Sequence, residues 1–148
     1  ARLAGYEVRA LPVSGYRHWQ GRSFGGNRVA ENRLSTTFRR RALSERNKSF
    51  VMVLTYPAPL FQIMLPLHLV LLLTEGIVLA LLKRQWAPFR EIYLACLKAL
   101  WHERVRLRRL RRELESQRSV GRWRFFSVFC GLPHKLHLLL KHGIPQIR

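Results

Sequence analysis

Residues 60–82 read LFQIMLPLHLVLLLTEGIVLALL, and this stretch decides the fold of the chain. It closes a run of 33 residues, 50–82, that contains neither Lys nor Arg. An α-helix rises about 1.5 Å per residue, so about 20 residues are enough to cross the ~30 Å hydrocarbon core of a bilayer. We therefore expect a membrane-associated helix in this stretch.

Dense positive charge flanks the apolar stretch on both sides. Cations occupy positions 39, 40, 41, 46 and 48 before it and positions 83, 84 and 90 after it. A single span would place one of these clusters on the far side of the membrane, against the tendency of cations to stay on the cytoplasmic side. We therefore favour a re-entrant hairpin or a pair of in-plane helices, bent at Pro57, Pro59 and Pro66, over a single span.

A buried core helix of a water-soluble protein is the third interpretation of the same residues. Gln62, His68 and Glu75 interrupt the lipid-like surface of the segment. The rest of the chain, however, offers too little apolar surface to enclose a segment of this length. The sequence thus favours lipid as the surroundings of the segment.

The balance of charge requires an anionic partner. Lys and Arg number 27 against 8 acidic residues, all of them Glu, and the net charge is +19. Phosphate, nucleic acid and the anionic face of a membrane are the partners that such a surface attracts. The two cysteines, Cys96 and Cys130, match no metal-ligand spacing, and we expect both to be small apolar residues in a reducing compartment.

The first 48 residues have the character of a soluble domain. Arg2-Leu3-Ala4 has the appearance of the last turn of a helix, which Gly5 would end. Residues 6–11 alternate in the manner of a half-buried strand. A Gly-rich loop follows, and residues 29–47 are expected to form a basic helix with an apolar face made by Leu34, Phe38 and Ala42.

Residues 83–148 combine Leu periodicity with dense Arg. Leu97, Leu100, Leu107, Leu110 and Leu114 recur at helical spacing, and six arginines crowd positions 104–112. This pattern predicts a basic amphipathic helix on an anionic membrane surface, followed by a break at Gly121 and an aromatic cluster. The residues expected to contact lipid are Leu69, Leu72, Leu79, Trp101, Arg108 and Arg112. We expect no nucleic-acid partner, because no known nucleic-acid module accompanies the arginines.

Two short patterns invite stronger interpretations. Gly21-Arg22-Ser23-Phe24-Gly25 matches the nucleophile elbow of serine hydrolases, but the chain has no room for the large sheet which that elbow requires. His134, His137 and His142 suggest a metal site, but their spacing does not place all three on one helical face and no acid accompanies them. The glycines of a loop explain the first pattern, and histidines on the surface explain the second.

The order of the segments resembles the C-terminal part of bacterial family 2 glycosyltransferases. The matching residues are Arg2-Leu3-Ala4-Gly5-Tyr6-Glu7-Val8, then His18 with Gly21 and Ser23, then Glu45-Arg46-Asn47. The proline-interrupted Leu run and the Arg-rich tail follow in the order of the family. The likeness covers nearly all 148 residues, and it implies that the chain is a piece of a longer enzyme.

The resemblance implies an inverting enzyme with the GT-A fold. It would transfer a sugar from a nucleotide-sugar donor, through a divalent metal (Mg or Mn), to a lipid-linked or glycan acceptor in surface polysaccharide synthesis. His18 matches a metal ligand of the family, and Gly21, Ser23 and Arg46 fall in its substrate-binding region. The chain has no Asp, so it lacks the Asp-x-Asp motif and the catalytic base, and it is expected to hold no metal and to be inactive alone.

These expectations define a fold class and a compartment. We expect an α+β fold, mostly α, in three parts: a glycosyltransferase-domain remnant (1–48), a hydrophobic membrane hairpin or span (49–82) and basic amphipathic helices (83–148). The expected place is the cytoplasmic face of a bacterial inner membrane. The alternatives are a non-enzymatic membrane-anchored adaptor and a basic nucleic-acid-binding protein.

Overall fold

A computed structural model of the protein describes residues 2–7, 26–30, 33–127, 140–141, 143 and 146–147. The described part is mostly helical, which confirms the mostly α character of the predicted fold class. Contacts divide the chain into two compact units: a helical unit, Phe38–Gln117, and a terminal unit, Ala1–Thr37 with Arg118–Arg148. These boundaries differ from those of the three predicted parts, 1–48, 49–82 and 83–148. The division into those parts stays a prediction.

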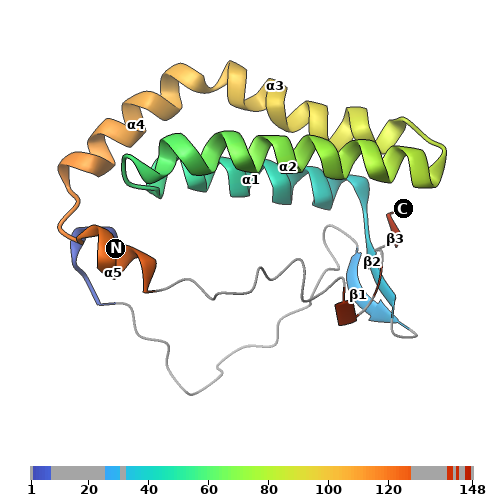
Figure 1. Ribbon diagram of the computed structural model, residues 1–148, viewed down its shortest axis with the longest axis horizontal. Helices are drawn as coiled ribbons and strands as arrows, with labels where there is room; N and C mark the ends of the chain where they lie inside the picture. Colours follow the sequence, from blue (N-terminus) through green and yellow to red (C-terminus); the bar gives the residue numbers. More distant parts are fainter. Residues whose placement is uncertain are drawn as a thin grey trace. The chain divides into compact units, whose positions relative to one another are not determined.

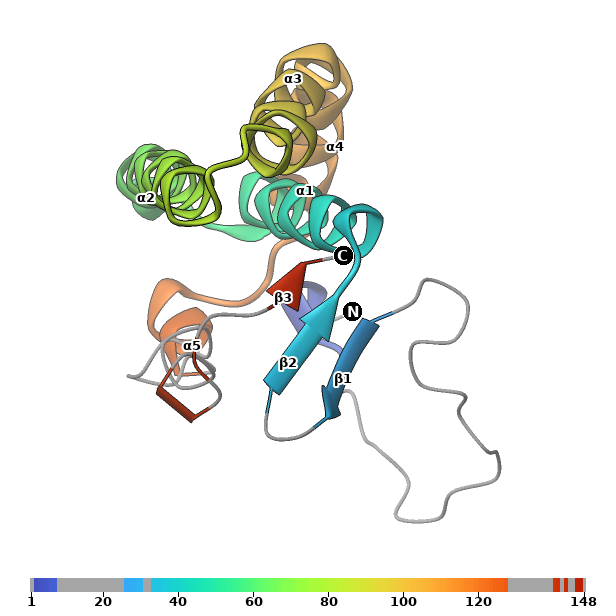
Figure 2. The ribbon, with the colours of Figure 1, turned by 90° about the vertical axis from the view of Figure 1, so that its right-hand side faces the viewer.

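Five helical segments build the helical unit. They are α1 (Phe38–Thr55), α2 (Leu60–Lys83), the π-helix η2 (Phe89–Leu94), α3 (Ala95–His102) and α4 (Arg104–Ser116). Helix α1 packs against all the others, whereas α2 packs against α1 and η2. Figure 2 views the unit along its helices and shows α1 between α2 on one side and the α3–α4 segment on the other.

Prolines determine the connection between α1 and α2. Pro57 and Pro59 follow the end of α1 and lack the amide hydrogens that would continue it. Helix α2 begins directly afterwards, where the amide of Phe61 donates to the carbonyl of Pro57 at 2.9 Å. The bend predicted at Pro66 is wrong, because Pro66 lies inside α2, which continues through it to Lys83. The two helices therefore form an antiparallel hairpin (Figure 1).

The second half of the unit returns along the hairpin. Arg84 ends α2 in the left-handed conformation (φ 51°), and its amide donates to the carbonyl of Leu81. The chain then enters η2, which buries Ile92 and Tyr93 completely. A short break at Glu103 separates α3 from α4.

The start of the predicted basic helix is wrong. Residues 29–47 were expected to be helical, but Gly26–Ala30 (β1) and Arg33–Thr36 (β2) form an antiparallel hairpin, and α1 begins only at Phe38. Leu34 has helical spacing to Phe38 and Ala42, yet it lies in β2. The expected end is also wrong, because α1 continues to Thr55 and places Asn47 in its interior. The apolar residues after Asn47 pack against the other helices and extend α1.

The terminal unit holds the short elements. One 3₁₀ turn, η1 (Arg2–Ala4), ends at Gly5 with φ +85°, which confirms the predicted stop. The amide of Ser119 donates to the carbonyl of Leu3 at 2.9 Å. Strand β3 (Gln146–Ile147) pairs in parallel with β2. The basic helix α4 already ends at Ser116, before the predicted break at Gly121, and a short helix that the sequence did not predict, α5 (Arg122–Phe126), follows Gly121. The expected strand over residues 6–11 lies mostly outside the described residues.

Candidate membrane interface and its polar core

Helix α2 exposes its most apolar face. Within the described residues it is the helix that is long and apolar enough to cross a membrane, and 22% of its most apolar window is buried. We call its exposed face the outer stripe, and its eight large apolar side chains are Ile63, Leu67, Val70, Leu71, Ile77, Val78, Leu81 and Leu82. Their spacing of three and four residues places them on one side of the helix. At about 1.5 Å per residue the outer stripe is roughly 28 Å long.

The ionisable residues inside α2 point the other way. His68 contacts Ser49 of α1, and Glu75 contacts Arg41 of α1 and Tyr93 of η2. In a water-soluble helix the polar residues face outward and the apolar ones face the core. Helix α2 has the opposite polarity, which is typical of helices whose surroundings are lipid.

A charge network joins α1, α2 and η2. Arg41 Nη2 donates to Glu75 Oε1, Arg41 Nε lies 3.3 Å from Glu45 Oε1, and Lys48 Nζ lies 3.1 Å from Glu45 Oε2. Tyr93 Oη donates to Glu75 Oε1 at 3.2 Å. Two cations thus balance two carboxylates, of which Glu45 is fully buried. We call Arg41, Glu45, Lys48, Glu75 and Tyr93 the charge network.

Burial and charge together set the proton affinities in the charge network. Burial lowers the pKa of the Arg41 guanidinium, but the carboxylates of Glu45 and Glu75 more than offset this effect, so its pKa is raised. Burial and then the charge of Glu75 raise the pKa of Tyr93 well above its usual range. Arg41 therefore stays charged and Tyr93 stays a hydrogen-bond donor at neutral pH.

A second cluster surrounds the Ser49 hydroxyl. Its Oγ donates to the carbonyl of Glu45 at 2.9 Å and lies 2.9 Å from His68 Nε2 and 3.4 Å from Cys96 Sγ. A hydroxyl has one proton and two lone pairs, so His68 and Cys96 are the donors in this arrangement. Burial raises the pKa of the Cys96 thiol. Since Ser49 is fully buried, the cluster braces three helices and offers no accessible nucleophile.

Arg111 closes the hairpin from α4. Its guanidinium donates to the carbonyl of Val53 and, at 2.8 Å, to that of Tyr56, and it lies 4.2 Å from the ring centre of Phe61. Carbonyls at the end of a helix lack intrahelical partners, so Arg111 supplies donors where α1 ends. The same contact places α4 next to the start of α2.

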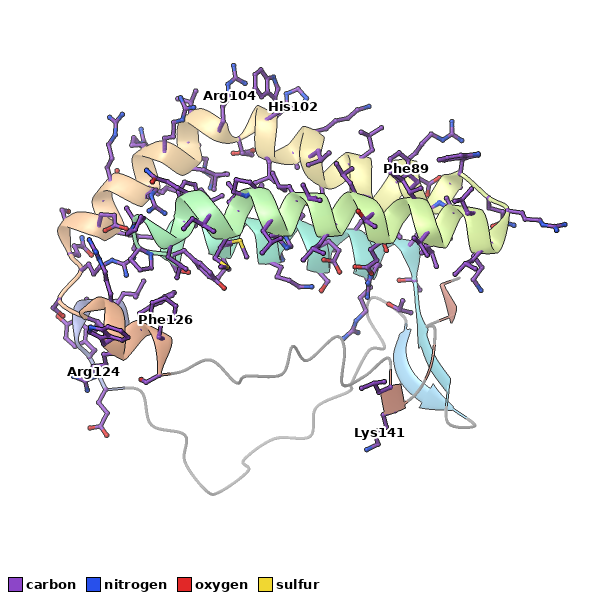
Figure 3. All side chains as sticks on the ribbon, in the orientation of Figure 1. Phe89, His102, Arg104, Arg124, Phe126 and Lys141 are labelled. Atoms are coloured by element: carbon purple, nitrogen blue, oxygen red, sulfur yellow. The ribbon has the colours of Figure 1, made fainter. Side chains whose placement is uncertain are left out.

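Exposed cations cover the outside of α4. They are Arg104, Arg106, Arg108, Arg109 and Arg112. Arg104 lies 4.3 Å from the Trp101 ring centre, and Figure 3 shows it and His102 pointing away from α1 and α2. Arg106 and Arg109 pair with neighbouring glutamates, whereas Arg108 and Arg112 have no ion-pair partner among the described residues.

The structure divides the residues predicted to contact lipid. Trp101 is 66% exposed, and Arg108 and Arg112 are also exposed, as expected for contacts with surroundings. Leu72 is 1% exposed and Leu79 is 7% exposed, so both pack inside the helical unit, and Leu69 is half-buried. Their neighbours on the outer stripe, Leu71 and Val78, occupy the exposed positions instead. The inward-pointing His68 and Glu75 are seven residues apart, and Leu72 and Leu79 lie four residues after them on the same side of the helix, so this spacing was the signal that could have separated the two faces.

The predicted substrate residues are mostly outside the described part. His18, Gly21 and Ser23 lie outside the residues that the structure describes, and so do Cys130 and His134. Arg46 lies in the interior of α1, where its guanidinium is 5.8 Å from the Phe50 ring centre and bonds to Asn47 Oδ1. Among the residues that the structure describes, no three His, Cys or carboxylate side chains gather as a metal site.

Sequence reasoning missed the charge network. Glu75 is the one acidic residue in a run of 33 residues without a cation, and a buried carboxylate requires a partner. That signal indicates that a partner exists, but not which of the many arginines it is. No family model, curated protein or solved structure matches this chain, so the family resemblance rests on its own motifs.

Proposed function

We propose that the protein is the membrane-attached end of an inverting glycosyltransferase that passes a sugar from a nucleotide-sugar donor to a lipid-linked or glycan acceptor. The observation that carries membrane attachment is the inverted polarity of α2, with its outer stripe exposed and its ionisable residues inside. The transferase activity is supported by the order of the motifs around His18, Glu45-Arg46-Asn47 and the Leu run. Its proposed place is the cytoplasmic face of a bacterial inner membrane.

Lipid contact accounts for the outer stripe energetically. The eight side chains are about half exposed, and full burial of one such side chain contributes ~1.5–3 kcal/mol. Contact with acyl chains would therefore contribute roughly 6–12 kcal/mol to attachment. The exposed arginines of α4 add attraction to anionic headgroups of about 1 kcal/mol each near the surface.

The described carboxylates do not suit the divalent metal that such enzymes use. A hard cation requires several free oxygen ligands, but Glu45 and Glu75 are bound to Arg41, Lys48 and Tyr93. Glu103 and Glu113 pair with arginines along α4. In the proposed enzyme, a longer protein would supply the Asp-x-Asp motif and the catalytic base that the family uses, and His18 would be a further metal ligand.

The reading frame and an activity assay test this proposal. We expect the gene to encode, before Ala1, a segment with Asp-x-Asp and an acidic pair close to Ala1. Membranes containing the longer protein should transfer label from a nucleotide-sugar, with a dependence on Mg²⁺ or Mn²⁺. His18→Ala should lower this metal-dependent turnover, whereas His102→Ala, on the exposed side of α3, should leave it unchanged.

Two results would contradict the proposal. A start codon directly before Ala1 would favour the membrane adaptor, because no donor-binding part would then exist. Equal turnover in the His18→Ala and His102→Ala proteins would remove the assignment of His18 as a metal ligand.

A further inference from the structure

We propose that α2 lies in the plane of one anionic leaflet and does not cross the bilayer, with its outer stripe among the acyl chains and the polar face of α1 in water. This inference rests on the proposed membrane attachment and goes beyond it, because it names the orientation and the lipid surface that is bound. Two observations support it: the register between α1 and α2, and the cations at both ends of the outer stripe.

Two contacts fix the register of the hairpin. Arg41 meets Glu75, and Ser49 meets His68, so α1 runs antiparallel along α2. The midpoint of α2, near residues 71 and 72, therefore lies level with residue 45 of α1. Helix α1 thus lies beside the central part of α2, so the two helices would share one depth in the bilayer if α2 crossed it.

The exposed face of α1 is polar at this level. Ser44, Asn47 and Lys48 are exposed there, and Lys48 retains 43% of its side-chain surface although it pairs with Glu45. If α2 crossed the membrane, these side chains would sit within about 5 Å of the bilayer centre at 1.5 Å of rise per residue. One cation at that depth opposes insertion by roughly 100-fold. Arg39 and Arg40, one turn farther along α1, would also lie in the hydrocarbon.

An in-plane orientation removes this conflict without changing what the outer stripe contacts. The stripe leaves α2 on the side away from its packing partners, α1 and η2. With that side toward the acyl chains, the polar face of α1 can remain in water. Amphipathic units of this kind sink only about 5–10 Å into the boundary between headgroups and acyl chains.

Cations at both ends of the outer stripe point to one leaflet. Exposed Lys83, Arg84 and Arg90 follow the end of α2. Arg108 and Arg112 lie on α4, which Arg111 attaches to the start of α2 through Phe61. Figure 1 shows α4 at the end of the unit where α1 and α2 connect, and the turn into η2 at the opposite end. In the plane of the membrane both groups can reach headgroups of the same anionic leaflet, whereas a span would separate them.

Cysteine labelling of the full chain tests the orientation. The natural cysteines are replaced (Cys96→Ser, Cys130→Ser), and single cysteines are introduced by Ala58→Cys, Gln85→Cys, Asn47→Cys or Leu71→Cys. Ala58 and Gln85 are exposed at the two ends of α2. The probe is a membrane-impermeant maleimide, applied to intact bacterial cells whose outer membrane has been permeabilised and to inside-out vesicles of the inner membrane.

We expect Ala58→Cys, Gln85→Cys and Asn47→Cys to be labelled in inside-out vesicles at rates within about threefold of one another, and to be protected in cells. Leu71→Cys should be labelled at least tenfold more slowly in both preparations. Labelling of Ala58→Cys and Gln85→Cys from opposite sides, or protection of Asn47→Cys in both preparations, would establish a span and overturn this inference while membrane attachment stands.

Other outcomes separate failure of the orientation from failure of attachment. If the protein is recovered in the soluble fraction and Leu71→Cys reacts as fast as Asn47→Cys, both proposals are overturned. If the soluble protein forms a disulfide between two copies through Leu71→Cys, a second copy covers the outer stripe and lipid is excluded as its occupant.

Discussion

Glu45, which is fully buried, and Glu75, which is half-buried, are the two carboxylates among the packed helices of a unit whose surroundings are proposed to be lipid. An unpaired buried charge is strongly unfavourable, so each carboxylate has a cation within reach. Glu75 receives two donors from different helices, Arg41 and the phenol of Tyr93. The charge network therefore joins three helices, and its loss should be felt in the stability of the whole unit.

Glu75→Gln should lower the free energy of unfolding of the helical unit by about 1–3 kcal/mol. The amide keeps the shape of the side chain but removes the ion pair with Arg41, whose guanidinium keeps its ion pair with Glu45. The value lies below that for a fully buried pair because Glu75 is 36% exposed. Urea unfolding in detergent micelles, followed by circular dichroism, measures the change.

Glu113→Gln is the matched control for this prediction. Glu113 pairs with Arg109 at 3.6 Å, and both side chains are more than half exposed. Exposed pairs of this kind contribute less than about 1 kcal/mol. An equal loss of stability in the two variants would show that the charge network contributes no more than an exposed pair.

At the scale of elements, the contact between α2 and η2 depends on one glycine. Gly76 is buried, and a Cβ atom added there would lie 2.7 Å from Tyr93 Cγ and 3.0 Å from Phe89 Cδ2. These distances are too short for carbon atoms, so one of the rings would have to move. The absent side chain thus allows the aromatic residues of η2 to approach the backbone of α2.

Gly76→Ala should destabilise the helical unit by roughly 1–2 kcal/mol, because overpacking costs about 1–3 kcal/mol and the helix propensity of Ala returns up to about 1. Thermal unfolding in micelles, with Gly121→Ala as the control, measures this effect. Gly121 has φ −66° and no atom within 4 Å of an added Cβ, so its substitution should change stability by less than about 0.5 kcal/mol. A more stable Gly76→Ala protein would refute the close approach.

The predicted start of α1 is wrong because it depends on the pairing of strands. Leu34, Phe38 and Ala42 have helical spacing, but Leu34 also suits a strand that ends before Phe38. Pairing with β1 and β3 decides between these possibilities, and it involves residues as distant as Gln146. Local periodicity contains no information about that pairing.

At the scale of the whole molecule, the proposed membrane attachment depends on which face of α2 is outside. Leu71→Arg should reduce partition to anionic vesicles by roughly tenfold or more, because the variant loses the burial of a Leu side chain, which contributes ~1.5–3 kcal/mol when complete, and brings a charge to the acyl chains. Leu71 is 59% exposed, so the helical unit should keep its circular dichroism. Vesicle co-sedimentation measures the partition.

Two neighbouring variants make the result specific to the outer stripe. Asn47→Arg, on the polar face of α1, should leave vesicle binding unchanged or slightly stronger. Leu72→Arg should unfold the helical unit, because Leu72 is 1% exposed among the packed helices. Undiminished binding of the Leu71→Arg protein would count against lipid contact by the outer stripe.

The sequence by itself determined that residues 60–82 form a long apolar helix, that a basic helix follows, that prolines separate the helices and that a turn stops at Gly5. These features depend on composition, backbone propensity and local periodicity, which are properties of neighbouring residues. Only the tertiary structure decided that Leu71 is outside and Leu72 inside, and that Glu75 pairs with Arg41, 34 positions away. Whether the side of α2 that carries His68 and Glu75 faces inward depends on whether the other helices supply partners for them, and a carboxylate among many arginines obtains its partner only when the helices pack.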